Sequence, residues 1–251
     1  MKWMMAAIIG AGMLLAVALA AGAFGQGSRL QSDRSRPTIA VMTSLPLIWG
    51  ERGAFDPASR PTEAWRLLDS RFDMRPIDVL DQEPLVGADA LLLAQPRWLA
   101  PGELVYLDRW LRGGGGALIL ADPDLAWPSP LPLGDIRRPL PASLLAPLLG
   151  HWGLRLDSGD GGRSETRVDG RRLAFDTVGR FRGRGKICTV GPEWMARCRL
   201  GKGRAVLVAD ADLMRYEIWR GRFAGFGQAE NILFLGDQLD WLVNDGRTRS
   251  D

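Results

Sequence analysis

The sequence contains little of the side-chain chemistry on which metal and nucleophile sites depend. Its 251 residues include a single histidine, His151, and two cysteines, Cys188 and Cys198. Structural zinc sites need several Cys and His ligands at short spacing, which this inventory does not supply. A serine triad would have to use His151, and no G-x-S-x-G elbow is present. We therefore expect no metal, no cofactor and no catalytic residue.

Motifs for phosphate and nucleic acid are also missing. The glycines at 113–116 precede an apolar run instead of following one, and Gly201-Lys202-Gly203 lacks the rest of a P-loop. The net charge is only +3, and no basic run alternates with aromatic residues, so we expect no nucleic-acid partner. Arginines do cluster at 169–185, where they either solvate a small sheet or form a docking patch for anionic lipids or an acidic partner.

The two cysteines lie ten residues apart, on either side of a predicted turn at 191–194. In an oxidising compartment this spacing makes Cys188 and Cys198 a candidate disulfide across a hairpin.

The N-terminus has the pattern of an export signal. One lysine is followed by about twenty uncharged residues, with a small-residue cleavage site at 21–23. The apolar stretch 4–24 is also long enough to span a bilayer. Residues 1–24 are therefore a signal peptide or an N-terminal membrane anchor, and 25–37 form a linker. The expected location is the inner membrane, with the domain on the periplasmic side, or the periplasm itself.

Beyond the linker, short aliphatic runs alternate with helical patterns. Strands are predicted at 38–44, 73–79, 89–95, 117–122 and 205–209, and helices at 62–72, 101–113 and 228–245. This alternation predicts an α/β fold, a mostly parallel Rossmann-like sheet with helices on both faces. The domain extends over 38–245, with an antiparallel hairpin region inserted at 158–203, where Asp169-Gly170 marks a hairpin turn. Residues 246–251 form a tail.

Two segments carry a resemblance to a known family. "LLLAQPRWLAPGELVYLDRWLRGGGGALILADP" and "GKGRAVLVADADLMRYEIW" resemble the central and closing units of the GldG-type domain of uncharacterised ABC-transporter auxiliary proteins. That family is similar in fold to class I glutamine amidotransferases, whose nucleophilic cysteine follows a central strand. Here Asp122-Pro123 stands at that place, so the amidotransferase triad is absent. The resemblance implies the fold without its chemistry, and a membrane-linked accessory role beside transport-complex subunits.

Two apolar runs end in the same motif, Ala-Asp-x-Asp-Leu. It places Asp122 and Asp124 after one predicted strand, and Asp210 and Asp212 after another. Parallel strands would bring all four carboxylates to the edge where open α/β sheets bind ligands. Three roles are open for them: helix capping and turns, a ligand or divalent-metal site, or acid–base catalysis.

Three tryptophans follow predicted strand ends and are further ligand candidates: Trp49, Trp127 and Trp219. Exposed indoles would suit a sugar ring or a partner's apolar surface, whereas buried ones would fix long loops onto the domain. Thr43 and Ser44 end the first strand and would add hydroxyl groups to the same crevice.

Three hypotheses follow from the sequence. The first is a non-catalytic, exported or membrane-anchored accessory domain of an ABC-type transport or cell-envelope complex. The second is a periplasmic carbohydrate-binding domain, with a glycan as ligand. The third is a divalent-metal-dependent hydrolase that uses the four aspartates.

Overall fold

The protein is described here from a computed structural model, which defines residues 36–50, 57–132, 134–183, 185–220 and 230–247. The chain divides into two units, Met1–Arg36 and Pro37–Asp251, and every element described below belongs to the second. The predicted leader and nearly all of the predicted linker lie outside the described residues. Within the described ranges, no helix has the length and apolar composition needed to cross a membrane.

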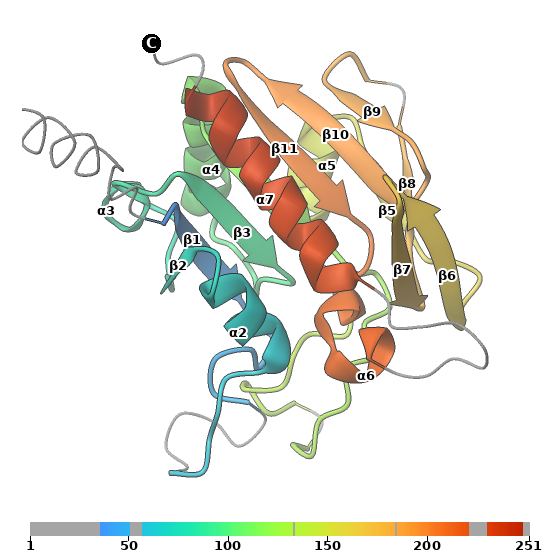
Figure 1. Cartoon of the computed structure of the whole chain (residues 1–251). Coiled ribbons are helices and arrows are strands. Elements are labelled where there is room, and N and C mark those ends of the chain that lie inside the picture. Colours follow the sequence, from blue (N-terminus) through green and yellow to red (C-terminus); the bar gives the residue numbers. More distant parts are fainter. Residues whose placement is uncertain (1–35, 51–56, 133, 184, 221–229, 248–251) are drawn as a thin grey trace, which may run out of the picture. The chain divides into compact units, whose positions relative to one another are not determined.

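A seven-stranded sheet forms the centre of the second unit (Figure 1). Its strands lie in the order β2-β1-β3-β4-β11-β10-β9, and all neighbours from β2 to β11 pair in parallel. β10 is antiparallel to both of its neighbours. The strands are β1 (Thr38–Thr43), β2 (Asp73–Pro76), β3 (Ala90–Ala94), β4 (Gly116–Leu120), β9 (Cys188–Val190), β10 (Met195–Leu200) and β11 (Gly203–Val208). The predicted Rossmann-like α/β fold is confirmed.

Helices cover both faces of this sheet, and Figure 1 shows α7 crossing one of them. α2 (Glu63–Asp69) lies against α7 (Asn231–Arg247) on that face, and α4 (Pro101–Gly113) and α5 (Ala146–His151) pack on the opposite side. α2 begins as the sequence predicts, because the Thr62 hydroxyl accepts a hydrogen bond from the backbone N–H of Trp65. The remaining short helices are α3 (Gln82–Leu85), η1 (Asp212–Met214) and α6 (Tyr216–Trp219).

The continuous apolar strands divide their side chains between two cores. Leu92 and Leu118 point toward α7, whereas Leu91 and Ile119 point toward α4 and α5. Successive side chains of a strand face opposite sides, so a strand covered on both faces must be apolar throughout. β3 and β4 are fully buried for this reason.

Two antiparallel pairs lie outside the central sheet, and all of their strands except β5 fall within the predicted insertion at 158–203. β5 (Arg155–Asp157) pairs with β8 (Arg180–Arg182), and β6 (Arg163–Val168) pairs with β7 (Arg171–Asp176). The β6–β7 turn is made by Asp169 and Gly170 at φ +50° and +80°, the positive values that a two-residue hairpin turn requires. β9 and β10 come from the same region but extend the central sheet.

Candidate functional site

The carboxyl edge of the sheet gathers three of the four predicted aspartates. β4 and β11 are neighbouring parallel strands, so Asp122 and Asp210 emerge side by side, and Asp212 follows at the start of η1. One carboxylate oxygen from each lies within 4.8 Å of the others, and all three residues are fully buried. Asp124 does not join them, since it is exposed and contributes its backbone N–H to Asp122 Oδ1 at 2.9 Å.

Every carboxylate oxygen of this three-aspartate cluster accepts a hydrogen bond from the protein. Asp122 accepts from the backbone N–H groups of Asp124 and Ala211, at 2.9 and 2.8 Å. Asp210 accepts from Leu213 and Asp176, at 2.8 and 3.1 Å.

The third carboxylate follows the same pattern. Asp212 accepts from the backbone N–H of Ala126 at 2.6 Å and from Arg215 Nη1 at 3.4 Å. The cluster therefore ties three separate segments together: the loop after β4, the end of β7 and the turn after β11. The hydrogen bonds are of the kind considered above for helix capping and turns. Some of them are local, and others join segments that are distant in the sequence.

Arg215 lies beside the cluster and was not identified from the sequence. Its Nη2 contacts Asp176 Oδ2 at 2.6 Å, and its Nη1 donates to the backbone oxygen of Ala126 at 2.5 Å. The guanidinium is buried, so it partly balances the negative charge of Asp212 and Asp176. Its only signal in the sequence was its position, as a basic residue directly after the apolar pair of Asp-Leu-Met.

Burial controls the protonation of the cluster. Removal from water raises the pKa of Asp122 to about 7 and the pKa of Asp212 to about 6. Burial, and then the nearby carboxylates of Asp122 and Asp212, raise the pKa of Asp210 well above its ordinary range. The cluster therefore holds protons at a pH where exposed carboxylates are ionised.

A buried glutamine, Gln95, organises the same edge one strand further along. Its side chain accepts from the Asp122 N–H at 2.9 Å and donates to the carbonyl oxygens of Asp122 and Leu140, both at 3.1 Å. The Gln95 carbonyl accepts from the N–H and the hydroxyl of Ser44, at 3.2 and 2.5 Å. Gln95 has φ +42°, a strained value for a non-glycine residue. A polar residue directly after the apolar run of β3 was its only signal.

The hydroxyl groups predicted for the crevice are engaged within the fold. Ser44 is buried and donates to Gln95, and Thr43 Oγ1 accepts from the backbone N–H of Leu45 at 2.9 Å. Both side chains fix the turn after β1.

Two of the three candidate tryptophans are not available to a ligand. Trp127 and Trp219 belong to the core beneath α7, and only Trp49 is exposed, at 53%. Of the two roles left open for these indoles, Trp127 and Trp219 therefore take the buried one and only Trp49 is placed for a ligand. Trp127 packs in the core, and the residue before it, Ala126, donates its backbone N–H to buried Asp212. Trp219 lies in α6, where its indole N–H donates to Met214 and Tyr216 packs against its ring.

Cys188 and Cys198 face each other directly on β9 and β10 and form a disulfide. This bond closes the loop that contains the turn at 191–194.

Arginines of the 169–185 cluster pair with carboxylates of the same chain. Arg171 contacts Glu230 and Asp237, and Arg182 contacts Asp157 at 3.0 Å. These pairs match the interpretation in which arginines solvate a small sheet.

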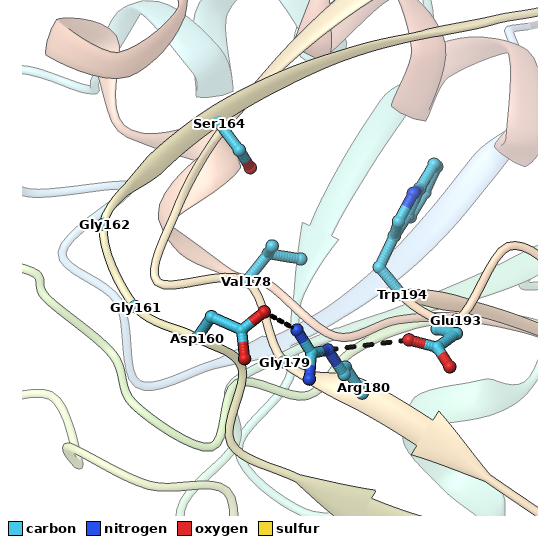
Figure 2. Close-up of a pocket in the computed structure, with 9 residues that line it drawn as sticks. All are labelled: Asp160, Gly161, Gly162, Ser164, Val178, Gly179, Arg180, Glu193 and Trp194. Carbon is cyan, nitrogen blue, oxygen red and sulfur yellow. Dashed lines mark hydrogen bonds and ion pairs between the residues drawn. The ribbon is translucent and has the colours of Figure 1, made fainter.

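A hollow of about 260 Å³ lies next to β8 and the turn before β10 (Figure 2). Residues with polar or aromatic side chains line it, and none was predicted as a site residue: Asp160, Ser164, Arg180, Glu193 and Trp194.

Comparison with known proteins finds one family similar to part of this chain. Residues 36–160 match the model of a family described as an ABC-type uncharacterized transport system. This part of the chain is similar to that family. The GldG-type resemblance drawn from "LLLAQPRWLAPGELVYLDRWLRGGGGALILADP" is confirmed, because that segment lies within the match. No curated protein matches the sequence.

Several solved structures are similar to this chain at low sequence identity. The mmIFT52 N-terminal domain is 15% identical with a TM-score of 0.50, over 82% of this chain and 97% of that one. The exo-β-1,4-mannosidase Op5Man5 from Opitutaceae bacterium strain TAV5 is 13% identical with a TM-score of 0.46, over 91% of this chain. This chain covers only 38% of that enzyme. The cytoplasmic protein STM1381 from Salmonella typhimurium LT2 is 13% identical with a TM-score of 0.44, over 82% and 99%. At 15% identity, the likeness to the mmIFT52 domain concerns the fold alone.

Proposed function

We propose that this protein is an accessory subunit of an ABC-type transport complex and acts by binding a partner subunit. The observation that carries the proposal is the family match over residues 36–160.

The sheet edge argues against the use of its three aspartates as catalytic acids or bases. In open α/β folds, substrates bind beyond the carboxyl ends of the strands. Here Asp122, Asp210 and Asp212 lie at that edge, fully buried, with each oxygen accepting a hydrogen bond from the protein. Catalytic acids and bases must instead reach a substrate. The hydrogen bonds of the cluster instead stabilise the loops around it.

The proposed location is the inner membrane, with the domain on the periplasmic side. The uncharged stretch 4–24 would anchor the chain, or would be cleaved to release the domain into the periplasm. The Cys188–Cys198 disulfide supports this location, because disulfides persist in oxidising compartments.

Crosslinking and co-purification test the proposal. Cells producing the full chain with a C-terminal tag are crosslinked, and their membranes are gently solubilised. We expect recovery of the ATPase and permease subunits of a transporter, at levels above those from an unrelated exported protein with the same leader and tag. A chain that begins at residue 25 should lose this recovery. Equal recovery with the unrelated protein would contradict the proposal.

A divalent-cation site at the cluster is the competing interpretation, because the three oxygens within 4.8 Å are the hard ligands that Mg²⁺ and Ca²⁺ prefer. A cation that bound only the folded chain would raise its melting temperature. We expect no change on adding MgCl₂ or CaCl₂. A rise that the Asp212→Asn substitution abolishes would favour the metal-dependent hydrolase over the accessory role.

A further inference from the structure

The hollow beside β8 has the features of a small polar binding site. Its volume of about 260 Å³ lies just below the range of pockets for drug-sized ligands, which suits a single small ring. Figure 2 shows Asp160, Arg180 and Glu193 in a row along one side, with Val178 between Ser164 and Trp194.

The charges of this hollow select against an anion. Arg180 is the central cation, and it already contacts Asp160 and, at 3.5 Å, Glu193. Two carboxylates and one guanidinium leave the group with one net negative charge. An incoming anion would meet both carboxylates, and a wholly apolar molecule would strip water from three charged groups without replacing it.

The same groups suit hydroxyls. The side chains of Asp160 and Glu193 are 83% and 69% exposed, so they retain acceptor capacity for a ligand. The Ser164 hydroxyl both donates and accepts, and the Arg180 fork donates. Exposed ion pairs contribute little free energy, so a ligand that binds between these side chains loses little by disturbing the ion pairs.

Trp194 supplies a fixed apolar wall. Its ring packs against Phe175 and Phe234, with centroid distances of 4.9 and 6.1 Å. These two core rings hold the indole in place while it lines the hollow. A rigid aromatic ring offers a π face to C–H groups at little cost in conformational entropy.

The walls are preformed by the backbone. Gly179 N–H donates to the Ala209 carbonyl at 2.7 Å, and Phe181 N–H donates to the Glu193 carbonyl at 2.6 Å. The Cys188–Cys198 disulfide closes the hairpin that carries Glu193 and Trp194. A site held in this way loses little conformational entropy when a ligand binds.

We infer that this hollow binds a neutral saccharide ring. The C–H face of the ring packs on Trp194, its hydroxyls donate to Asp160 and Glu193, and Ser164 and Arg180 donate to ring or hydroxyl oxygens. This site differs from the Trp49, Trp127 and Trp219 set expected from the sequence. The inference goes beyond the transport role and does not depend on it.

Ligand-observed saturation-transfer NMR on the full chain tests the inference. The probes are glucose, galactose, mannose and N-acetylglucosamine, with glucuronate as the anion and choline as the cation. We expect at least one neutral sugar to bind more tightly than choline, and glucuronate not to bind. Asp160→Asn and Glu193→Gln should each weaken sugar binding at least fivefold, because an amide nitrogen replaces one acceptor oxygen. Both side chains are exposed, so these variants should fold.

Two controls make the result decisive. Glu217→Gln changes an exposed carboxylate on α6, outside the hollow, and should bind sugar as the unmodified chain does. Trp194→Phe should weaken binding, with the melting temperature of each variant measured alongside. Binding of no neutral sugar would overturn the inference, and so would preferential binding of choline or glucuronate. Sugar binding that Asp160→Asn and Glu193→Gln leave unchanged would place the site elsewhere and would also overturn it.

Discussion

The three-aspartate cluster makes the stability of this protein depend on pH in an unusual direction. Burial raises the pKa of Asp122 from 3.8 to about 7, so the folded state holds this proton more tightly than the unfolded state does. A raised pKa stabilises the fold below the unfolded pKa, and that contribution is lost as pH rises through the folded pKa. We therefore expect the free energy of unfolding to fall between pH 4.5 and pH 8.

The size of the effect follows from the shift. The full shift of about three pKa units corresponds to roughly 4 kcal/mol at about 1.4 kcal/mol per unit for this buried group. About 3 kcal/mol of it is lost between pH 4.5 and pH 8, because the change begins below pH 4.5. The raised pKa of Asp212, about 6, acts in the same direction. Carboxylates whose pKa is lowered, such as Asp135 at about 2, stay ionised throughout this range and add nothing to the change.

Urea unfolding at pH 4.5, 6 and 8, followed by tryptophan fluorescence, measures the effect. Asp122→Asn removes the titrating group but puts a donor against a backbone N–H, which costs roughly 1–3 kcal/mol at pH 4.5. That deficit should shrink by up to about 3 kcal/mol at pH 8, where the native aspartate must ionise. Asp124→Asn is the matched control, because Asp124 is exposed and should keep the native slope.

Two results would refute this reasoning. One is a free energy of unfolding that stays constant or rises from pH 4.5 to pH 8. The other is a pH slope in Asp122→Asn equal to that of the unmodified protein, which would mean that Asp122 does not carry the proton.

Three further predictions concern the scaffold. Gly203→Ala places a Cβ 2.1 Å from the Leu111 carbonyl oxygen and should lower the free energy of unfolding by about 1–3 kcal/mol in urea titrations, whereas Gly150→Ala meets no atom within 4 Å and should not lower it. Asn231→Ala removes three hydrogen bonds to buried backbone groups and should cost about 2–4 kcal/mol; a loss below 1 kcal/mol by calorimetry would contradict that role. Replacing both Cys188 and Cys198 by Ser opens a disulfide between residues ten apart and should cost about 3 kcal/mol, with dithiothreitol having the same effect on the native chain but none on the variant.

The general architecture was predictable because each strand of the parallel sheet is buried on both faces. A strand such as β3 must then be a short continuous apolar run, and the run 90–94 can be recognised without knowing its neighbours. Local structural signals could also be recognised in the sequence, as the capping of α2 by Thr62 and the hairpin turn at Asp169 show. Both depend on residues within a few positions of each other.

The site was less predictable, because its contacts join segments far apart in the chain. The repeated motif placed Asp122 and Asp210 at one edge, but it could not show that their oxygens would be consumed by backbone N–H groups. The segment that carries Trp127 is held by a hydrogen bond from Ala126 to Asp212, 86 residues away. Nothing in the local sequence of Trp127 encodes that bond.

The sequence by itself determined the alternation of strands and helices, the absence of an amidotransferase triad and the pairing of two carboxylate motifs. Periodicity and residue inventory are properties of the linear chain, so they can be read from it. Only the tertiary structure decided which polar groups are satisfied internally and which face a hollow. Asp160, Arg180, Glu193 and Trp194 come together because the loop before β6, β8 and the turn before β10 converge in space, and that convergence is a result of packing.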